Sequence, residues 1–218
     1  MAVVGILPAA GRGERLGGQL PKAFAVCGGR PLLEWSLDVL SEVCDRVVVA
    51  VPRGYEDGVD RVPGAGSRSA SVRAALAAAP EASVAVVHDA ARPLVTVELL
   101  RRCVEAVDDV SVAGAVAAAP MTDTVKQAAP DGRVLRTLDR SGLWRIQTPQ
   151  AFRADALRRA LDVSEDALAA ASDDASLVEA AGGLVRVVVS PPENLKVTSA
   201  VDLDVAELLL RRRSDARC

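Results

Sequence analysis

The sequence predicts an α/β protein built on one mostly parallel sheet with helices on its faces. The chain opens with an apolar run (2–7), a segment with apolar residues at helical spacing (31–41) and a valine-rich run (46–51). Strand, helix and strand in this order are typical of a parallel sheet with right-handed crossovers. We find no internal repeat, low-complexity linker or second domain, so we predict a single domain over residues 1–218.

Composition limits the function before any motif is considered. The chain has 218 residues, of which 50% are apolar and 25% charged, as in an ordinary globular protein. A formal charge of -3 argues against nonspecific binding to nucleic acid, and aromatic residues at 2% leave almost no platform for stacking bases. Anionic substrates must therefore be held by local clusters of arginine and lysine.

Cysteine usage and the absence of targeting signals indicate the compartment. The four cysteines are scattered without a C-x-x-C pair, and His88 is the sole histidine, so we expect reduced thiols and no zinc site of the usual ligand set. The N-terminus lacks a basic segment before an apolar stretch, and no apolar run reaches the ~20 residues that span a membrane. We expect a cytoplasmic protein with no nucleic-acid or membrane partner.

A glycine-rich loop after the first strand carries the clearest sign of function. Residues 2–7 form the expected strand, Pro8 ends it, and Gly11 and Gly13 let the backbone approach a ligand so that N–H groups converge on an anion. The loop also carries three cations: Arg12, Arg15 and Lys22. It is therefore predicted to hold a polyphosphate, and the alternative is a surface turn with solvated charges.

Two well-known phosphate-binding patterns do not account for this loop. The P-loop pattern G-x-x-x-x-G-K-[ST] fails because Gly18 is followed by Gln19. The dinucleotide fingerprint fails because Leu16 stands where its third glycine is needed. If the loop binds phosphate, it uses a different pattern.

A second glycine turn leads into a helix expected within residues 64–79. Its serines suit the first turn of a helix that is otherwise rich in alanine. The N-terminal end of a helix presents free N–H groups to an anion or to the edge of a base. A plain capped helix is the alternative that these residues leave open.

A polar cluster follows the buried strand expected at residues 83–87. Ligands of open α/β sheets bind at the carboxyl ends of the strands, which is where His88, Asp89 and Arg92 fall. A lone histidine beside an apolar run is more often a satisfied core residue, and we interpret His88 in this way. An acid and a base at a strand end can bind sugar hydroxyls and a phosphate, so Asp89 and Arg92 are candidate binding residues.

Residues 121–138 differ in character from the rest of the chain. A helix is expected at 96–107 and a strand at 112–118, and alternating residues then flank a turn signal at 130–132, which predicts a β-hairpin. A hairpin projecting from a finished sheet has exposed edges, and pairing with a second copy of the chain would cover them. The alternative is a self-contained surface hairpin.

The remaining residues continue the alternation of strands and helices. Strands are expected at 145–152 and 184–189, and helices at 154–161 and 199–213. The segment SDDA at 172–175 begins another helix, with a capping residue and with acids at the positive helix end. Capping accounts for this segment, so we assign it no catalytic role.

Several blocks in this order resemble those of one enzyme family. PAAGRGERLGGQLPK is similar to the signature loop of the sugar-nucleotide-forming nucleotidyltransferases, in which P-A-A-G-x-G-x-R is followed by P-K. Through V-H-D-A-A-R-P, G-x-x-S-R-x-x-S-V and N-L-K-V-T, the chain most resembles the 2-C-methyl-D-erythritol 4-phosphate cytidylyltransferases of the non-mevalonate isoprenoid pathway. This resemblance implies one Rossmann-like domain with a protruding β-arm, at about residues 121–142, that is used for dimerisation.

The resemblance also implies a reaction. CMP would pass from CTP to a sugar-alcohol phosphate with release of pyrophosphate, and Mg²⁺ or another divalent cation would be held mainly by the triphosphate. The working unit would be a homodimer. Two alternatives stay open: a cytidylyltransferase for another acceptor, such as ribitol 5-phosphate, and a nucleotide-binding homologue that has lost the chemistry. The presence of Arg15, Lys22 and Lys196 together argues against the second alternative.

The family's residue roles carry over to the matching positions of this chain. The implied catalytic cations are Arg15, Lys22 and Lys196. Nucleotide binding is implied for Pro8, Ala9, Ala10, Gly11, Arg12, Gly13, Gly64, Ala65, Arg68, Ser71 and Ala90. Acceptor binding is implied for Asp89, Arg92, Thr124, Arg140 and Thr148. Of these acceptor residues, Thr124 and Arg140 would reach the partner subunit's site from the arm, and no metal ligand from the protein is assigned.

Overall fold

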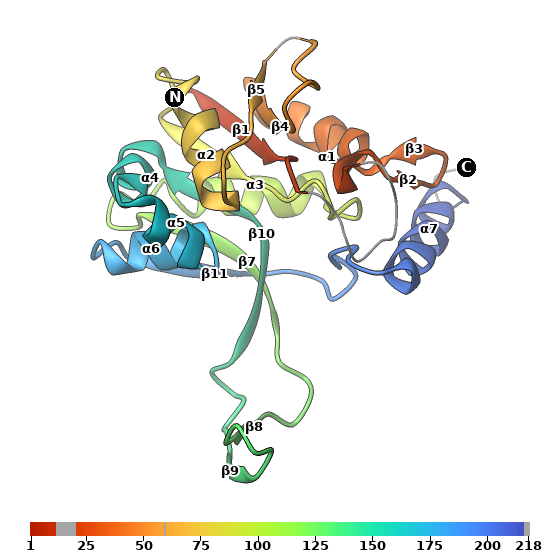
Figure 1. Ribbon diagram of the computed structural model, residues 1–218, viewed down its shortest axis with the longest axis vertical. Helices are drawn as coiled ribbons and strands as arrows, with labels where there is room; N and C mark the ends of the chain where they lie inside the picture. The colour runs from red at the N-terminus through yellow and green to blue at the C-terminus, as the bar shows by residue number, and fades with distance from the viewer. Residues whose placement is uncertain (12–20, 59, 216–218) are drawn as a thin grey trace.

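The centre of the molecule is a seven-stranded sheet, which confirms the predicted fold class (Figure 1). The computed structural model describes residues 1–11, 21–58 and 60–215. In spatial order the strands are β11 (Val185–Val189), β7 (Gly114–Pro120), β10 (Trp144–Arg153), β6 (Val84–Val87), β1 (Val3–Pro8), β4 (Arg46–Val51) and β5 (Arg61–Pro63). Strand β10 runs antiparallel to both of its neighbours, whereas the other pairs of this sheet are parallel.

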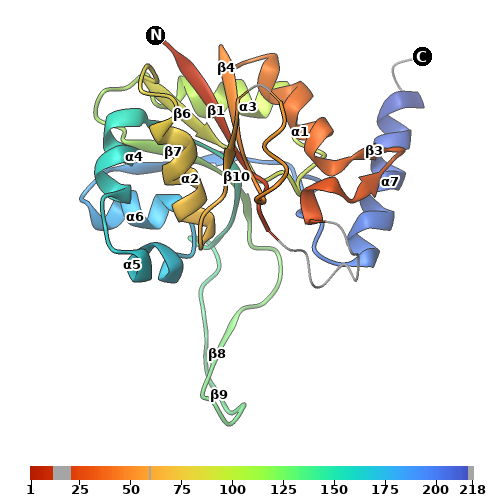
Figure 2. The same ribbon diagram turned by 45° about the horizontal axis from the view of Figure 1, so that its top comes forward.

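Helices cover both faces of the sheet (Figure 2). They are α1 (Leu32–Ser41), α2 (Arg68–Ala77), α3 (Val97–Glu105), α4 (Ala154–Leu161), α5 (Glu165–Ala170), α6 (Asp174–Ala180) and α7 (Ala200–Asp215). Helices α1 and α3 pack on one face, and α2, α4, α5 and α6 pack on the other. No helix in the described part of the chain is long and apolar enough to cross a lipid bilayer.

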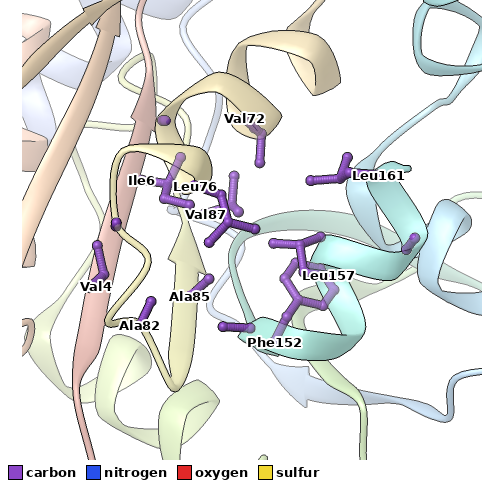
Figure 3. Close-up of a cluster of buried hydrophobic side chains, with 14 of the residues drawn as sticks. Val4, Ile6, Val72, Leu76, Ala82, Ala85, Val87, Phe152, Leu157 and Leu161 are labelled. Carbon is purple, nitrogen blue, oxygen red and sulfur yellow. The ribbon is translucent and has the colours of Figure 1, made fainter. Parts of the chain in front are cut away.

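Each face of the sheet has its own apolar core, because successive residues of a strand point to opposite faces. Ile6 packs into the core beneath α2 and α4, whereas the next residue, Leu7, packs into the core beneath α1 and α3. Figure 3 shows the first core, in which Phe152 of β10 lies beside Leu157 of α4. Fully burying an apolar side chain of this size contributes about 1.5–3 kcal/mol, so these strands and helices hold one another in place.

Several short elements were not predicted. One of them is β5, which pairs with β4 at the sheet edge. The other unpredicted elements are η2 (Lys22–Phe24), β2 (Val26–Cys27), β3 (Arg30–Pro31) and α5. Elements of two to six residues are too short to show a periodic pattern, so the sequence offered little signal for them.

The strand order reverses its direction at β1. The chain passes from β1 to β4 on one side and later returns to β6 on the other side. Ligands of open α/β sheets bind at such a reversal of strand order. Hydrogen bonds tie the segments that leave these strands to their neighbours: Ala9 N to Ala50 O at 2.7 Å, Gly64 N to Val51 O at 2.7 Å and His88 N to Ile6 O at 2.9 Å.

A long arm leaves the sheet between β7 and β10 (Figure 1). Its outer part is the hairpin of β8 (Lys126–Ala128) and β9 (Val134–Thr137), which confirms the predicted hairpin. Figures 1 and 2 both show the arm extending away from the helices and the sheet. Val134 and Leu135 near its tip are each 55% exposed. The use of the arm in dimerisation stays a prediction.

Candidate active site

A pocket of about 470 Å³ lies where β6, β10 and the segment after β11 meet. Its charged lining brings together residues that are far apart in the sequence: Arg68, Asp89, Arg92, Asp173, Glu179 and Lys196. The remaining lining residues are Ile146, Gln147, Thr148, Gln150, Ser172 and Ser176. Four of the predicted site residues with charged side chains therefore share one cavity with the predicted Thr148.

Asp89 is the carboxylate at the centre of this pocket. Its two oxygens pair with cations from different segments: Oδ1 with Arg68 Nε at 2.9 Å and Oδ2 with Lys196 Nζ at 2.7 Å. Burial by itself would raise the pKa of Asp89, but the positive charges of Arg68 and Lys196 outweigh burial and hold that pKa well below its usual range. Asp89 is therefore ionised and joins the segment of Arg68 to the segment of Lys196.

Arg68 has a second partner, Asp174, that the sequence analysis missed. Asp174 Oδ2 lies 2.5 Å from Arg68 Nη1, and the Asp174 side chain is fully buried. Burial lowers the pKa of Arg68, but the charges of Asp89 and Asp174 raise it above its ordinary value. Asp173 does cap α6, since it accepts a hydrogen bond from Ser176 N at 2.9 Å. Capping accounts for Asp173 but not for Asp174, so assigning this whole segment to capping was incomplete.

Arg92 and Lys196 are two further cations in the lining of the pocket. Arg92 is 8% exposed and donates from Nη1 to Asn194 O at 2.7 Å. The Lys196 side chain is 40% exposed. A phosphate that enters the pocket can compete with Asp89 for Lys196. Hydrogen bonds from a cationic group to an anionic oxygen are about twice as strong as those between neutral groups. The geometry suits an anionic substrate that also carries hydroxyl groups.

His88 is a satisfied core residue, as predicted. It is fully buried, with Nδ1 3.1 Å from Thr148 Oγ1 and Nε2 3.3 Å from Arg92 O. The carbonyl oxygen of Arg92 can only accept, so His88 donates from Nε2 and its Nδ1 accepts from the Thr148 hydroxyl. Thr148 Oγ1 in turn accepts a hydrogen bond from Asp89 N at 2.9 Å. His88 and Thr148 thus shape the turn that presents Asp89 and Arg92.

The burial of His88 predicts how stability depends on pH. Burial is the main cause that lowers the pKa of His88, to about 4, whereas an unfolded histidine has a pKa of about 6.5. Below about pH 6.5 the unfolded state binds more protons, so the contribution of His88 is lost as the pH falls toward 4. We expect His88→Gln to lose this dependence. The difference in unfolding free energy between the two proteins should shrink by about 2 kcal/mol from pH 7.5 to 5 in urea titrations. A difference that is constant over this range would contradict the prediction.

The first loop is described at its two ends. Pro8 closes β1, Ala9 is buried, Ala10 is half-buried and Gly11 is exposed. The backbone N–H of Lys22 donates to Gly11 O at 3.2 Å, which brings the ends of the loop together. Three predicted residues, Arg12, Gly13 and Arg15, lie outside the described residues.

The second glycine turn lies directly against the first loop. A Cβ atom on Gly64 would be 2.3 Å from Ala10 Cβ, so this close approach requires glycine. Ala65 is exposed, and its N–H donates to Ser71 Oγ at 3.0 Å. Ser71 is buried and donates its own proton to Ser67 O at 2.8 Å. Ser71 therefore shapes the turn, while Ala65 and Arg68 are open to a ligand. Ala90 is buried next to Asp89.

The two predicted arm residues do not line this pocket. Thr124 and Arg140 are both exposed, and Arg140 donates to Thr122 O within the arm. Sequence reasoning also missed three buried polar residues near the pocket: Gln147, Gln150 and Asn194. The signal for Gln147 and Gln150 was present, because polar residues interrupt an otherwise buried strand there.

Comparisons with known proteins agree with this architecture. The family model described as "IspD: 2-C-methyl-D-erythritol 4-phosphate cytidylyltransferase" matches residues 3–212. A relative of that name from Frankia casuarinae is 44% identical over 96% of this chain and 82% of its own length. One from Nocardia farcinica is 42% identical over 98% and 96%. The crystal structure of the Thermus thermophilus protein of that name has a TM-score of 0.82 at 37% identity, covering 97% of this chain and 100% of that one. The chain therefore belongs to the 2-C-methyl-D-erythritol 4-phosphate cytidylyltransferase family.

Proposed function

We propose that this chain transfers CMP from CTP to 2-C-methyl-D-erythritol 4-phosphate. The products are 4-diphosphocytidyl-2-C-methyl-D-erythritol and pyrophosphate, in the cytoplasmic synthesis of isoprenoid precursors. Besides family membership, one observation carries the proposal: Asp89 and Arg92 from one family block and Lys196 from another line one pocket. The nucleotide turn at Gly64 and Arg68 borders the same pocket through the ion pair of Arg68 with Asp89.

The chemistry requires cations more than it requires a base. An oxygen of the acceptor phosphate attacks the α-phosphorus of CTP, a new P–O bond forms, and the bond to the β-phosphate breaks to release pyrophosphate. Both reacting groups are anionic, and a cation at about 4 Å offsets on the order of 4 kcal/mol at an effective dielectric near 20. We assign this role to Arg15, Lys22 and Lys196. The acceptor phosphate is already ionised at neutral pH, so no general base is needed.

The acceptor is held by residues of the pocket and, we propose, by a second subunit. Arg92 binds the phosphate group of the acceptor, and Asp89 accepts hydrogen bonds from the hydroxyl groups of its sugar alcohol. In a homodimer, Thr124 and Arg140 reach the partner's pocket from the arm. Their exposure supports this arrangement, because both side chains are available to another molecule.

The residues of the pocket fit a divalent cation that arrives with CTP. Mg²⁺ takes oxygen ligands and in nucleotide sites is often bound through substrate phosphates and few carboxylates. Both oxygens of Asp89 are paired with Arg68 and Lys196, and no group of three or more metal-ligating side chains occurs among the described residues. The triphosphate would supply most ligands, and the cation would neutralise the leaving pyrophosphate. The residues of the chain then bind and orient the two substrates.

Nucleotide choice gives the direct test of this function. Arg68 and the backbone around Ala65 offer polar groups and no aromatic clamp, which suits a pyrimidine read by its edge. In a pyrophosphate-release assay we expect strong preference for CTP over ATP and GTP, with UTP the closest competitor. The acceptor panel should include 2-C-methyl-D-erythritol 4-phosphate and ribitol 5-phosphate. Equal turnover with ATP would rule out this base site, preference for ribitol 5-phosphate would change the acceptor, and no release from CTP would indicate an inactive homologue.

A further inference from the structure

Lys196 lies in a segment that has no regular structure of its own. Residues 190–199 connect β11 to α7 without forming a helix or a strand. A catalytic cation must nevertheless be held to within a fraction of an ångström, because a misplacement of 1 Å can cost about 100-fold in rate. Some other part of the chain must therefore fix this segment.

We propose that Asn194 is the positioning residue that holds Lys196 and Arg92 in register within the acceptor site. This inference rests on the proposed function. Asn194 is fully buried, and its side-chain Nδ2 donates to Gln147 Oε1 and to Thr148 O, each at 2.9 Å. Both acceptors lie where the pairing of β10 with β7 is interrupted, between Ile146 and Gln150. The side chain of Asn194 thus ties the Lys196 segment to the central sheet.

The backbone on either side of Lys196 is tied to the segment that carries Arg92. Arg92 Nη1 donates to Asn194 O at 2.7 Å, and Val197 N donates to Ala91 O at 2.8 Å. Val197 is fully buried in a cluster with Leu94 and α7. Lys196 therefore lies between two anchored residues, and one of them also receives the guanidinium of Arg92. The segments that carry Thr148, Arg92 and Lys196 therefore meet at Asn194.

The orientation of the Asn194 amide follows from its neighbours. Its Oδ1 is buried without a hydrogen-bond partner among the described residues, which is unfavourable. Turning the amide over would place this oxygen against the two carbonyl oxygens of Gln147 and Thr148, which is worse. The position therefore needs two N–H donors. An apolar side chain would avoid the unpaired oxygen but could not anchor the segment, and aspartate would present oxygen to oxygen.

Ser190→Ala is the matched control for Asn194→Ala. Ser190 is also buried and donates to the same Gln147 oxygen at 2.8 Å, and its Oγ accepts a longer hydrogen bond of 3.3 Å from Asn194 Nδ2. Ser190→Ala removes these contacts but leaves both 2.9 Å hydrogen bonds of Asn194 in place. Both substitutions should lower the melting temperature. We expect Asn194→Ala to lower kcat about tenfold or more and to raise the KM for the acceptor several-fold, with the KM for CTP within about twofold. Ser190→Ala should leave all three constants near wild type. If Asn194→Ala does not fold, Asn194→Ser, which keeps one donor, serves with smaller expected effects.

Lysine NMR tests the position of Lys196 without relying on activity. The chain contains three lysines, Lys22, Lys126 and Lys196, so a protein labelled with ¹³C at lysine Cε gives a small set of signals that Lys196→Arg assigns. In Asn194→Ala we expect the Lys196 signal to move toward the shift of a free lysine, while the Lys126 signal stays in place. An unchanged Lys196 signal, or equal kinetic effects in the Ser190→Ala control, would overturn the inference. A wild-type protein without transferase activity would instead overturn the proposed function, and the NMR result would still decide whether Asn194 positions Lys196.

Discussion

Replacement of Lys196 by methionine is expected to lower kcat by roughly 100-fold or more, the usual size for one preorganised electrostatic contact. Methionine keeps most of the length of the side chain and removes its charge. The ammonium group lies in the pocket 2.7 Å from Asp89, where an acceptor phosphate can displace the carboxylate. Lys196→Arg keeps the charge with a different shape, so its kcat should lie between those of the wild type and Lys196→Met. Steady-state kinetics at saturating CTP and acceptor measure the effect.

Stability should change little in the same variants, which separates a catalytic role from a structural one. The Lys196 side chain is 40% exposed, and ion pairs at such positions contribute about 0–1 kcal/mol. Asp89 retains its second partner, Arg68, at 2.9 Å, so it is not left as an unpaired buried charge. The melting temperature should therefore fall by about 2–4 °C at most. Near-wild-type turnover of Lys196→Met would show that this lysine does not act on the reacting phosphates. We expect a similar rate loss for Lys22→Ala.

Mixtures of two inactive variants are expected to regain activity if the arm serves the partner subunit. An Arg140→Ala subunit has a damaged arm and an intact pocket, and a Lys196→Ala subunit has the reverse. A mixed dimer then contains one complete site, built from the intact pocket of one subunit and the intact arm of the other. Random exchange of equal amounts makes about half of the dimers mixed, so the mixture should reach about a quarter of wild-type activity, well above either variant.

Three features of the arm support this expectation. The arm extends away from the rest of its own chain (Figures 1 and 2), and Arg140 is exposed and does not line the pocket. Val134 and Leu135 are apolar and more than half exposed, as suits a surface that a second copy covers. A mixture of tagged and untagged Arg140→Ala subunits provides the control. Activity of a monomer at assay concentration, or no recovery despite measured subunit exchange, would show that Arg140 does not act across subunits.

Local patterns predicted the long elements closely. The predicted strand at 46–51 and helix at 154–161 agree with β4 and α4 at both ends. The arginine and valine run of β4 is followed directly by Pro52, and apolar residues recur at helical spacing in α4, so each element is specified by its own residues. The helix expected within 64–79 begins after Ser67, which caps it by accepting a hydrogen bond from Ala70 N at 3.1 Å.

Distant contacts were less predictable. Nothing in the residues of β10 indicates that it runs against its neighbours, because the direction of a strand depends on the path of the chain before it. Arg68 and Asp174 are 106 positions apart, so no spacing rule connects them. Asn194 belonged to a recognised block, but its role depends on which carbonyl groups lie within reach of its amide.

By itself the sequence determined the fold class, the cationic loops and the family, because these depend on periodicity, on the positions of proline and glycine, and on the spacing of motifs along the chain. The tertiary structure decided which charges pair, which polar groups are buried and how the Lys196 segment is anchored. The physical reason is that hydrogen bonds and ion pairs act over a few ångströms. Their partners are chosen by the packing of segments that the sequence places far apart.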